Sequence, residues 1–282
     1  AWAGFQSLLQ APRAPKTVDL IIARCKSPLQ WLWELDYPAG SRVFVYDKCN
    51  RGLEEFRAQT SGLEGIVSLE YRQVAEVSEV IMTGECTAYL AHLAAGIRTA
   101  DFTIFLHDDA PRHIRMPLLS MVLRALRAGT YEVPFLHLAH ERYPSYRTPC
   151  LKEVHRQALR VELPDRLGTY CCSHFVVRRD RIEAHDPEFY QHLGDMVSQA
   201  TYGSDRGGAC RVGSKPCYVM EFLWHVVFGE PGELPPREED GRLPLALRYE
   251  GGRASRMPSP LRLAPYMELF HASRYSMKLL QQ

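Results

Sequence analysis

The sequence is short of several features that would assign it to a well-defined class of protein. It contains a single asparagine, Asn50, which is followed by Arg-Gly, so it has no acceptor for N-linked glycosylation. It has no run of about 18 apolar residues, the length that a membrane-spanning helix needs. Its formal net charge is only +1, whereas a nucleic-acid partner is expected to require a basic excess. We therefore expect neither a membrane span within this chain nor a polyanionic partner.

Several catalytic and cofactor-binding motifs are also missing. The sequence has neither G-x-G-x-x-G nor a P-loop, which argues against dinucleotide cofactors and ATPases. It has no G-x-S-x-G, so a serine nucleophile of the hydrolase type is not expected. What remains is the composition of an ordinary globular protein, with 282 residues of which 46% are apolar and 24% charged.

Cysteine is the one unusual component that is present in quantity. No two of the eight have the C-x-x-C spacing of a zinc site, and their even number favours disulfides. Cys210 and Cys217, in a Gly-rich stretch, suggest that several are bridged. Disulfides favour the secretory pathway, for which we expect the Golgi lumen, over the cytosol; the absence of an initial Met leaves room for a removed signal peptide or anchor. The eight are Cys25, Cys49, Cys86, Cys150, Cys171, Cys172, Cys210 and Cys217.

Short apolar runs alternate with helical patterns along the chain. The run at 18–25 is apolar almost throughout, which is typical of a strand buried on both faces of a parallel sheet. Ser27 and Pro28 have the residue types favoured at the N-cap and first position of a helix. The predicted strands are 18–25, 41–48, 65–74, 101–109 and 174–177. The predicted helices are 27–35, 84–97, 117–129, one from about 187, and 217–229, with a long loop at 201–217.

This alternation predicts a single α/β domain over residues 18–282, with a Rossmann-like, mainly parallel sheet flanked by helices. We expect residues 1–17 to form an N-terminal leader and the Pro-, Gly- and Arg-rich segment 230–265 to wrap the surface. In such sheets, ligands bind outside the carboxyl ends of the strands. Polar residues stand at four such positions, namely 24–26, 47–50, 84–85 and 107–109.

The triplet His107-Asp108-Asp109, at the end of the fourth predicted strand, has two interpretations. Two aspartates before Ala-Pro are typical of a turn that stops a strand. Carboxylates also suit a hard divalent cation such as Mg²⁺ or Mn²⁺, which takes oxygen ligands from the protein and from substrate phosphates. Because other strand ends are polar too, we favour the metal site.

Three segments, taken together in their order, resemble an uncharacterised eukaryotic domain family that is itself similar to nucleotide-sugar glycosyltransferases of the GT-A type. They are IIARCKSPLQWL, TGECTAYLAHLAAGIRTADFTIFLHDDAP, and HFVVRRDRI with EFY and EFLWHVVFG, so the resemblance covers about residues 18–229. Asp108 stands where that family usually has glycine, which makes the site more like the Asp-x-Asp element of GT-A enzymes. The resemblance implies a GT-A-like fold and a metal-dependent sugar transfer.

In such an enzyme a divalent metal would stabilise the negative charge that grows on the departing diphosphate. The resemblance makes Asp109 the first candidate ligand of Mn²⁺ or Mg²⁺ and Asp108 the second. GT-A enzymes often complete the metal shell with a histidine near the C-terminus, and here His271 is the candidate. A packed core histidine is the alternative interpretation of His271.

The other candidate residues would bind the donor or act as the base. Arg24 and Lys26 would meet the nucleotide or its phosphates, Asp47 would accept hydrogen bonds from ribose or base, and Glu85 would lie near the sugar. Each also has an ordinary structural interpretation, which for Glu85 is a favourable charge at a helix N-terminus. Glu221 stands in an apolar helical stretch, where a carboxylate must be paired or functional, so we expect it to deprotonate the acceptor hydroxyl.

The sequence therefore predicts a metal-dependent glycosyltransferase that moves a sugar from a nucleotide-diphosphate donor to a hydroxyl of a glycan or glycoprotein. Two alternatives stay open. One is a non-catalytic carbohydrate-binding protein on the same fold. The other is a metal-dependent phosphoester hydrolase, because two carboxylates and a metal also serve phosphate esters.

Overall fold

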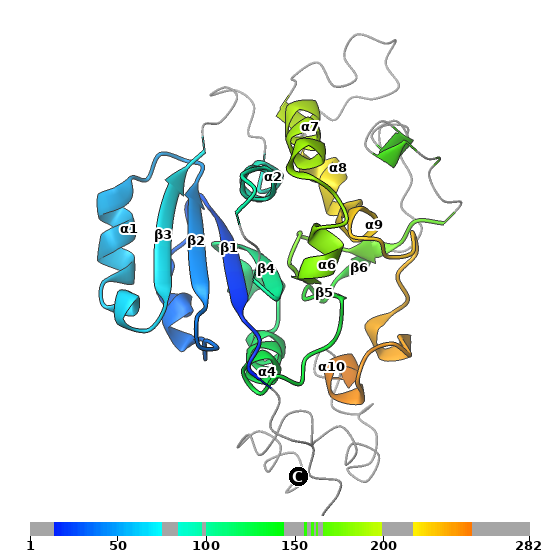
Figure 1. Cartoon of the computed structure of the whole chain (residues 1–282), viewed down its shortest axis with the longest axis horizontal. Helices are drawn as coiled ribbons and strands as arrows, with labels where there is room; N and C mark the ends of the chain where they lie inside the picture. Colours follow the sequence, from blue (N-terminus) through cyan, green and yellow to red (C-terminus); the bar gives the residue numbers. More distant parts are fainter. Residues whose placement is uncertain are drawn as a thin grey trace, which may run out of the picture.

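The core of the protein is a six-stranded sheet with the order β3-β2-β1-β4-β8-β5 (Figure 1). The computed structural model describes residues 14–74, 84–97, 100–143, 155–156, 159–160, 162, 166–198 and 217–249. Strands β1 to β4 are parallel, whereas β8 runs antiparallel to both of its neighbours. The strands are β1 (Val18–Arg24), β2 (Arg42–Asp47), β3 (Ser68–Gln73), β4 (Phe102–His107), β5 (Phe135–His137) and β8 (Phe175–Arg178), with a separate pair formed by β6 (Arg142–Tyr143) and β7 (Thr169–Tyr170).

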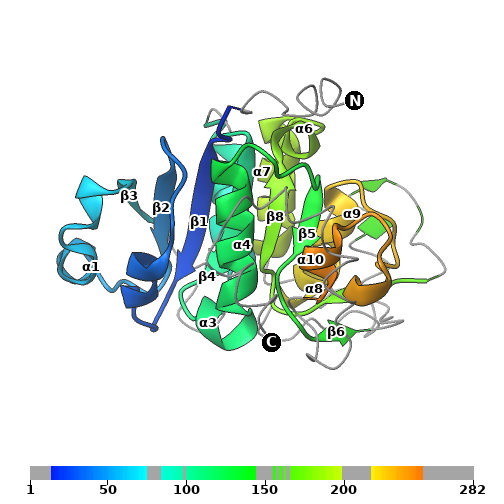
Figure 2. The same ribbon diagram turned by 90° about the horizontal axis from the view of Figure 1, so that it is seen from below.

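Helices cover both faces of the sheet, and α2 and α4 lie on opposite sides of the strands in Figure 1. Figure 2 shows α4 in front of β1 and β4. The α-helices are α1 (Leu53–Thr60), α2 (Cys86–Ala94), α3 (Ala110–His113), α4 (Met116–Arg127), α6 (Arg179–Ile182), α7 (Pro187–Ser198), α8 (Cys217–Glu221), α9 (Trp224–Val227) and α10 (Leu245–Tyr249). The 3₁₀ turns are η2 (Gln30–Glu34), η3 (Leu63–Gly65) and η4 (Arg237–Glu239). The predicted α/β class with a mainly parallel sheet is confirmed.

Successive residues of β1 enter different apolar cores, because side chains alternate across a strand. Leu20 and Ile22 pack in the core that α4 covers. Ile21 and Ala23 pack in the other core, with α2 and α7. All seven residues of β1 are buried, which explains why its sequence is apolar almost without interruption.

Three local predictions need correction. The segment predicted as a helix at 27–35 holds only the 3₁₀ turn η2, which begins after Leu29 rather than Ser27. The helix predicted at 217–229 is two short helices, α8 and α9, with turns between them. The described part of the segment predicted to wrap the surface, 230–249, buries Leu234, Leu243 and Leu247, so it contributes to the core. The predicted strands are confirmed, although α1 and β5 were not anticipated.

No helix within the described ranges is long and apolar enough to cross a lipid bilayer. Residues 1–13 and 250–282 lie outside these ranges, and so does most of the predicted loop 201–217. His271 and the predicted leader, apart from residues 14–17, therefore lie outside the described residues.

Candidate functional site

The carboxyl ends of β1, β2 and β4 lie side by side at one edge of the sheet. Arg24 at the end of β1 pairs with Asp47 of β2, and Ala23 pairs with His107 at the end of β4. From β1 the chain proceeds to β2 on one side, and from β4 it proceeds toward β5 on the other. The β1/β4 pair is therefore a topological switch point, the position at which open α/β sheets bind ligands.

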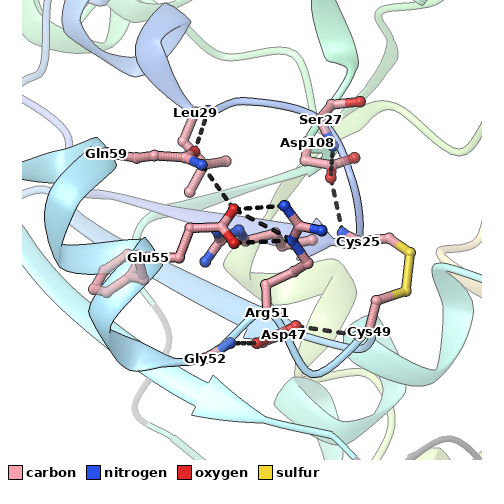
Figure 3. A network of polar contacts seen from close by, with 12 residues as sticks. Cys25, Ser27, Leu29, Asp47, Cys49, Arg51, Gly52, Glu55, Gln59 and Asp108 are labelled. Atoms are coloured by element: carbon pink, nitrogen blue, oxygen red, sulfur yellow. Dashed lines mark hydrogen bonds and ion pairs between the residues drawn. A yellow bond between two sulfur atoms is a disulfide. The ribbon is translucent and has the colours of Figure 1, made fainter.

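Asp108 anchors the loop that follows β1. Its Oδ2 accepts hydrogen bonds from the backbone N–H groups of Cys25 and Ser27, both at 2.8 Å (Figure 3). Its backbone oxygen accepts a bond from Nε1 of Trp31, also at 2.8 Å, and the residue is only 7% exposed. Asp108, predicted as a ligand, thus uses a carboxylate oxygen to fix the loop, and Ser27 is held in that loop instead of capping a helix.

Asp47 has the same kind of role at the end of β2. Its two oxygens accept bonds from the N–H of Cys49 at 3.1 Å, the N–H of Gly52 at 2.8 Å and the hydroxyl of Tyr71 at 2.7 Å. Burial raises the pKa of Asp47, but these hydrogen bonds outweigh burial and lower the pKa below its ordinary value. A disulfide between Cys25 and Cys49 joins the loops that follow β1 and β2. Asp47, which was predicted to bind ribose, therefore holds a loop that is also covalently linked to its neighbour.

Arg24 lies below the surface, whereas its predicted partner Lys26 is exposed. The Nη2 of Arg24 donates to Oε1 of Glu55 at 2.9 Å. Glu55 also binds Arg51 and Gln59, as Figure 3 shows. The Nη1 of Arg24 is buried without a hydrogen-bond partner in the described part of the chain. Of the two predicted phosphate ligands, only Lys26 therefore reaches solvent.

His107 and Asp109 form the centre of the candidate site. The Nδ1 of His107 lies 3.7 Å from Oδ1 of Asp109, and Oδ2 of Asp109 lies 3.2 Å from Nε2 of His113. Strand β4 ends at His107, and Asp109 is the N-cap of α3 with a φ of −99° and a ψ of 24°, so the chain turns there and Asp109 lies beside His107 while Asp108 faces the β1 loop. His107 was not among the predicted site residues, although it stands directly before two of them in the sequence.

Glu85 reaches this centre from the N-terminus of α2. Its Oε2 lies 3.9 Å from Nε2 of His107, and its Oε1 accepts a bond from the hydroxyl of Ser173 at 2.8 Å. The start of α2 is pressed against the start of α8: a Cβ on Gly84, whose φ is +83°, would lie 2.8 Å from Cβ of Cys217. A disulfide between Cys86 and Cys217 secures this contact. Cys217 is thus bonded to Cys86, which lies 131 positions away and outside the Gly-rich stretch that contains Cys217.

Glu221 reaches the same centre from the last residue of α8. Its Oε2 accepts a hydrogen bond from the N–H of Cys172 at 3.2 Å, and its charge acts on His107. Glu221 is half-buried, whereas the neighbouring Trp224 is fully buried and stacks on Phe228. Trp224 is thus a core residue.

The charges around His107 set its proton affinity. Burial alone would lower the pKa of His107, but the nearby carboxylate of Asp109 and the charges of Glu85 and Glu221 raise it above its ordinary value. In turn, the nearby imidazole of His107, together with His113, outweighs burial and lowers the pKa of Asp109 to about 2. The surrounding carboxylates therefore favour the protonated form of His107 relative to a free imidazole.

His174 stays neutral behind the site. Its ring lies 4.3 Å from that of His107, centre to centre, and stacks on His113 at 5.6 Å. Burial, together with the charges of His107 and His113, holds the pKa of His174 well below its ordinary value. Its Nε2 has no hydrogen-bond partner in the part of the chain that the structure describes.

Within the described ranges, the predicted metal ligands do not lie together at one site. Asp109 presents its carboxylate to the site, Asp108 is engaged with the β1 loop, and His271 lies outside the described ranges. Within those ranges, no group of three or more His, Cys, Asp or Glu side chains has an arrangement that would hold a metal ion. The residues that do assemble are Glu85, His107, Asp109 and Glu221, which come from three separate stretches of sequence.

Comparison with known families matches residues 134–242 to a family described as "Protein of unknown function (DUF3431)". The match spans fewer than half of the 282 residues. It contains Ser173 and Glu221 but not β1, β2, β4 or Asp109. No curated protein matches the chain. Because the function of the matched family is unknown, the match assigns no activity to the site.

Proposed function

We propose that this chain is a GT-A-type glycosyltransferase that moves a sugar from a nucleotide-diphosphate donor to an acceptor hydroxyl. The observation that carries the proposal is the convergence of Glu85, His107, Asp109 and Glu221 beside the β1/β4 switch point. The sheet supplies the place where α/β folds bind nucleotides. The cluster supplies groups that accept and donate protons there.

Sugar transfer needs a base for the acceptor hydroxyl and positive charge near the departing diphosphate. Glu221 is our candidate base, because the N–H of Cys172 fixes one of its oxygens. His107 is our candidate for the positive charge, because the surrounding carboxylates favour its protonated form. Asp109, between His107 and His113, orients the imidazole. In this assignment a proton leaves the acceptor through Glu221, while His107 faces the leaving group.

The donor diphosphate would meet both attraction and repulsion at this edge of the sheet. Lys26 offers an exposed ammonium group after β1, whereas Glu85, Asp109 and Glu221 are acidic. A divalent cation would reduce this repulsion, and Asp109 remains its proposed ligand. The predicted set of Asp108, Asp109 and His271 is not assembled within the described ranges.

Three disulfides support the proposed secretory, Golgi-lumenal location. Disulfides persist in oxidising compartments and are rare in the cytosol of most cells. None of the cysteines in the described ranges is free. The pairs are Cys25–Cys49, Cys86–Cys217 and Cys171–Cys172.

Thermal unfolding in the presence of nucleoside diphosphates tests the proposed donor site. A ligand that binds only the folded protein adds about 2.7 kcal/mol of stability at 100 times its Kd. We expect a shift in Tm with a nucleoside diphosphate, increased by Mn²⁺, and loss of the Mn²⁺ increment in Asp109→Asn. Stabilisation by free glycans alone would instead indicate a carbohydrate-binding protein and would contradict the proposal.

Turnover of a nucleotide sugar tests the proposed base. Glu221→Gln should reduce transfer by roughly 10²–10⁴-fold, the usual contribution of a general base, with little change in nucleotide binding. The matched control is Glu54→Gln, because the side chain of Glu54 is 87% exposed on α1. Equal turnover in both variants would remove Glu221 from the mechanism. Release of phosphate without sugar transfer would indicate the hydrolase.

A further inference from the structure

The turn between β7 and β8, residues 171–174, contacts three of the four residues at the centre of the site. The N–H of Cys172 donates to Glu221 at 3.2 Å, and the hydroxyl of Ser173 donates to Glu85 at 2.8 Å. The Nδ1 of His174 accepts a hydrogen bond from the backbone N–H of His107 at 3.4 Å. One short turn thus reaches residues that come from α8, α2 and β4.

The backbone of this turn adopts an uncommon conformation. Cys172 has a φ of +69° and Ser173 a φ of +47°. Residues with a Cβ avoid this left-handed region, and such residues persist there only where their surroundings hold them. At this turn, a disulfide joins Cys172 to Cys171, and the hydroxyl of Tyr89 donates to the backbone oxygen of Ser173 at 3.2 Å. The disulfide is the part of this support that a change in redox conditions removes.

We propose that the Cys171–Cys172 disulfide holds the turn as the positioning element of Glu85 and Glu221, so that reducing it disengages both carboxylates. Cys172 and Ser173 act through these carboxylates and are positioning residues. The consequence for sugar transfer rests on the proposed function. The consequence for the turn itself does not, because it follows from the contacts of the turn alone.

A dithiol reduces this disulfide in two exchange steps, and the exposure of the two cysteines indicates which sulfur is attacked first. Cys171 is 3% exposed, whereas Cys172 is partly exposed. A thiolate of the dithiol attacks Sγ of Cys172, the S–S bond breaks, and Sγ of Cys171 leaves with the electron pair and takes a proton from solvent. The second thiol of the reagent then displaces Sγ of Cys172, so two cysteine thiols and one oxidised reagent result.

Amide hydrogen exchange measures the effect on the turn without any substrate. After treatment of the protein with dithiothreitol, we expect exchange of the Cys172 amide to become at least about tenfold faster, the factor that loss of a hydrogen bond to a charged group corresponds to. Cys171→Ser/Cys172→Ser should behave in the same way without the reagent. Cys25→Ser/Cys49→Ser is the matched control and should leave exchange at Cys172 unchanged. Unchanged exchange after alkylation has trapped both thiols would overturn the proposal.

A glycine variant separates the conformation of the turn from its covalent bond. Cys171→Ala/Cys172→Gly has no disulfide, but glycine adopts a φ of +69° without steric cost. Wild-type turnover should fall at least about tenfold in dithiothreitol. The glycine variant should keep more activity than the double serine variant. Because it has no disulfide at 171–172, its turnover should not show the tenfold fall in dithiothreitol. Equal loss in dithiothreitol for wild type and glycine variant would assign the effect to another disulfide and refute the proposal. Absence of turnover from the untreated protein would contradict the proposed function, while the exchange experiment would still decide the role of the turn.

Discussion

Replacement of Asp108 by alanine should destabilise the protein through the loop after β1. The variant removes the acceptor of two N–H groups, those of Cys25 and Ser27. A hydrogen bond to a charged group contributes about 1.5–3 kcal/mol, and the low end applies here because the loop is only partly buried. The expected loss is therefore about 3 kcal/mol. At roughly 2–4 °C per kcal/mol for a chain of this size, Tm should fall by about 6–12 °C.

Differential scanning calorimetry at neutral pH, without metal or nucleotide, measures this loss. Glu54→Ala is the matched control, since the side chain of Glu54 is 87% exposed on α1 and accepts no backbone N–H bond within the described ranges; it should shift Tm by less than about 2 °C. Asp108→Asn keeps an acceptor oxygen without the charge and should fall between the two. A Tm for Asp108→Ala within about 2 °C of wild type would refute the anchoring role. Weaker metal-dependent nucleotide binding at an unchanged Tm would instead make Asp108 a ligand.

Two further predictions concern the supports of the site. The pKa of Asp47 is lowered because its hydrogen bonds outweigh burial, so its carboxylate stabilises the fold above about pH 4 and loses this contribution as the pH falls through the folded-state pKa. The Tm difference between wild type and Asp47→Asn should therefore be largest near neutrality and shrink in acid; a difference that grows in acid would contradict the sign. Gly84→Ala should cost about 1–3 kcal/mol in urea unfolding, because its Cβ would lie 2.8 Å from Cβ of Cys217. Gly40→Ala, with a φ of +76° but its nearest contact at 3.9 Å, should cost only about 1 kcal/mol, and equal costs would remove the steric argument.

The sheet could be predicted from the sequence because its strands carry strong local signals. Strand β1 is buried on both faces, and its apolar run marked it directly. The break between α8 and α9 carries no such signal. Met220, Phe222, Leu223 and Trp224 are all buried, so apolar residues face every direction and no period of 3.6 residues distinguishes one helix from two.

The candidate site was predictable in place but not in the roles of its residues. Glu85, Asp109 and Glu221 were predicted from separate segments, and the structure brings them together around His107. Asp47, like Asp109, was predicted as a ligand because it is a carboxylate at a strand end. Its oxygens nevertheless accept hydrogen bonds from backbone N–H groups. A carboxylate that binds a ligand and one that anchors a loop have the same residue type and position. Only the three-dimensional contacts separate them.

The Cys86–Cys217 bond also determines how the chain responds to a protease. The two cysteines are 131 positions apart, and each lies within four residues of a site carboxylate, Glu85 or Glu221. A single cut at any peptide bond between them leaves both fragments covalently joined, so the nicked protein would migrate as one band without reductant and as two with it. Both carboxylates would remain on one covalent molecule after such a cut.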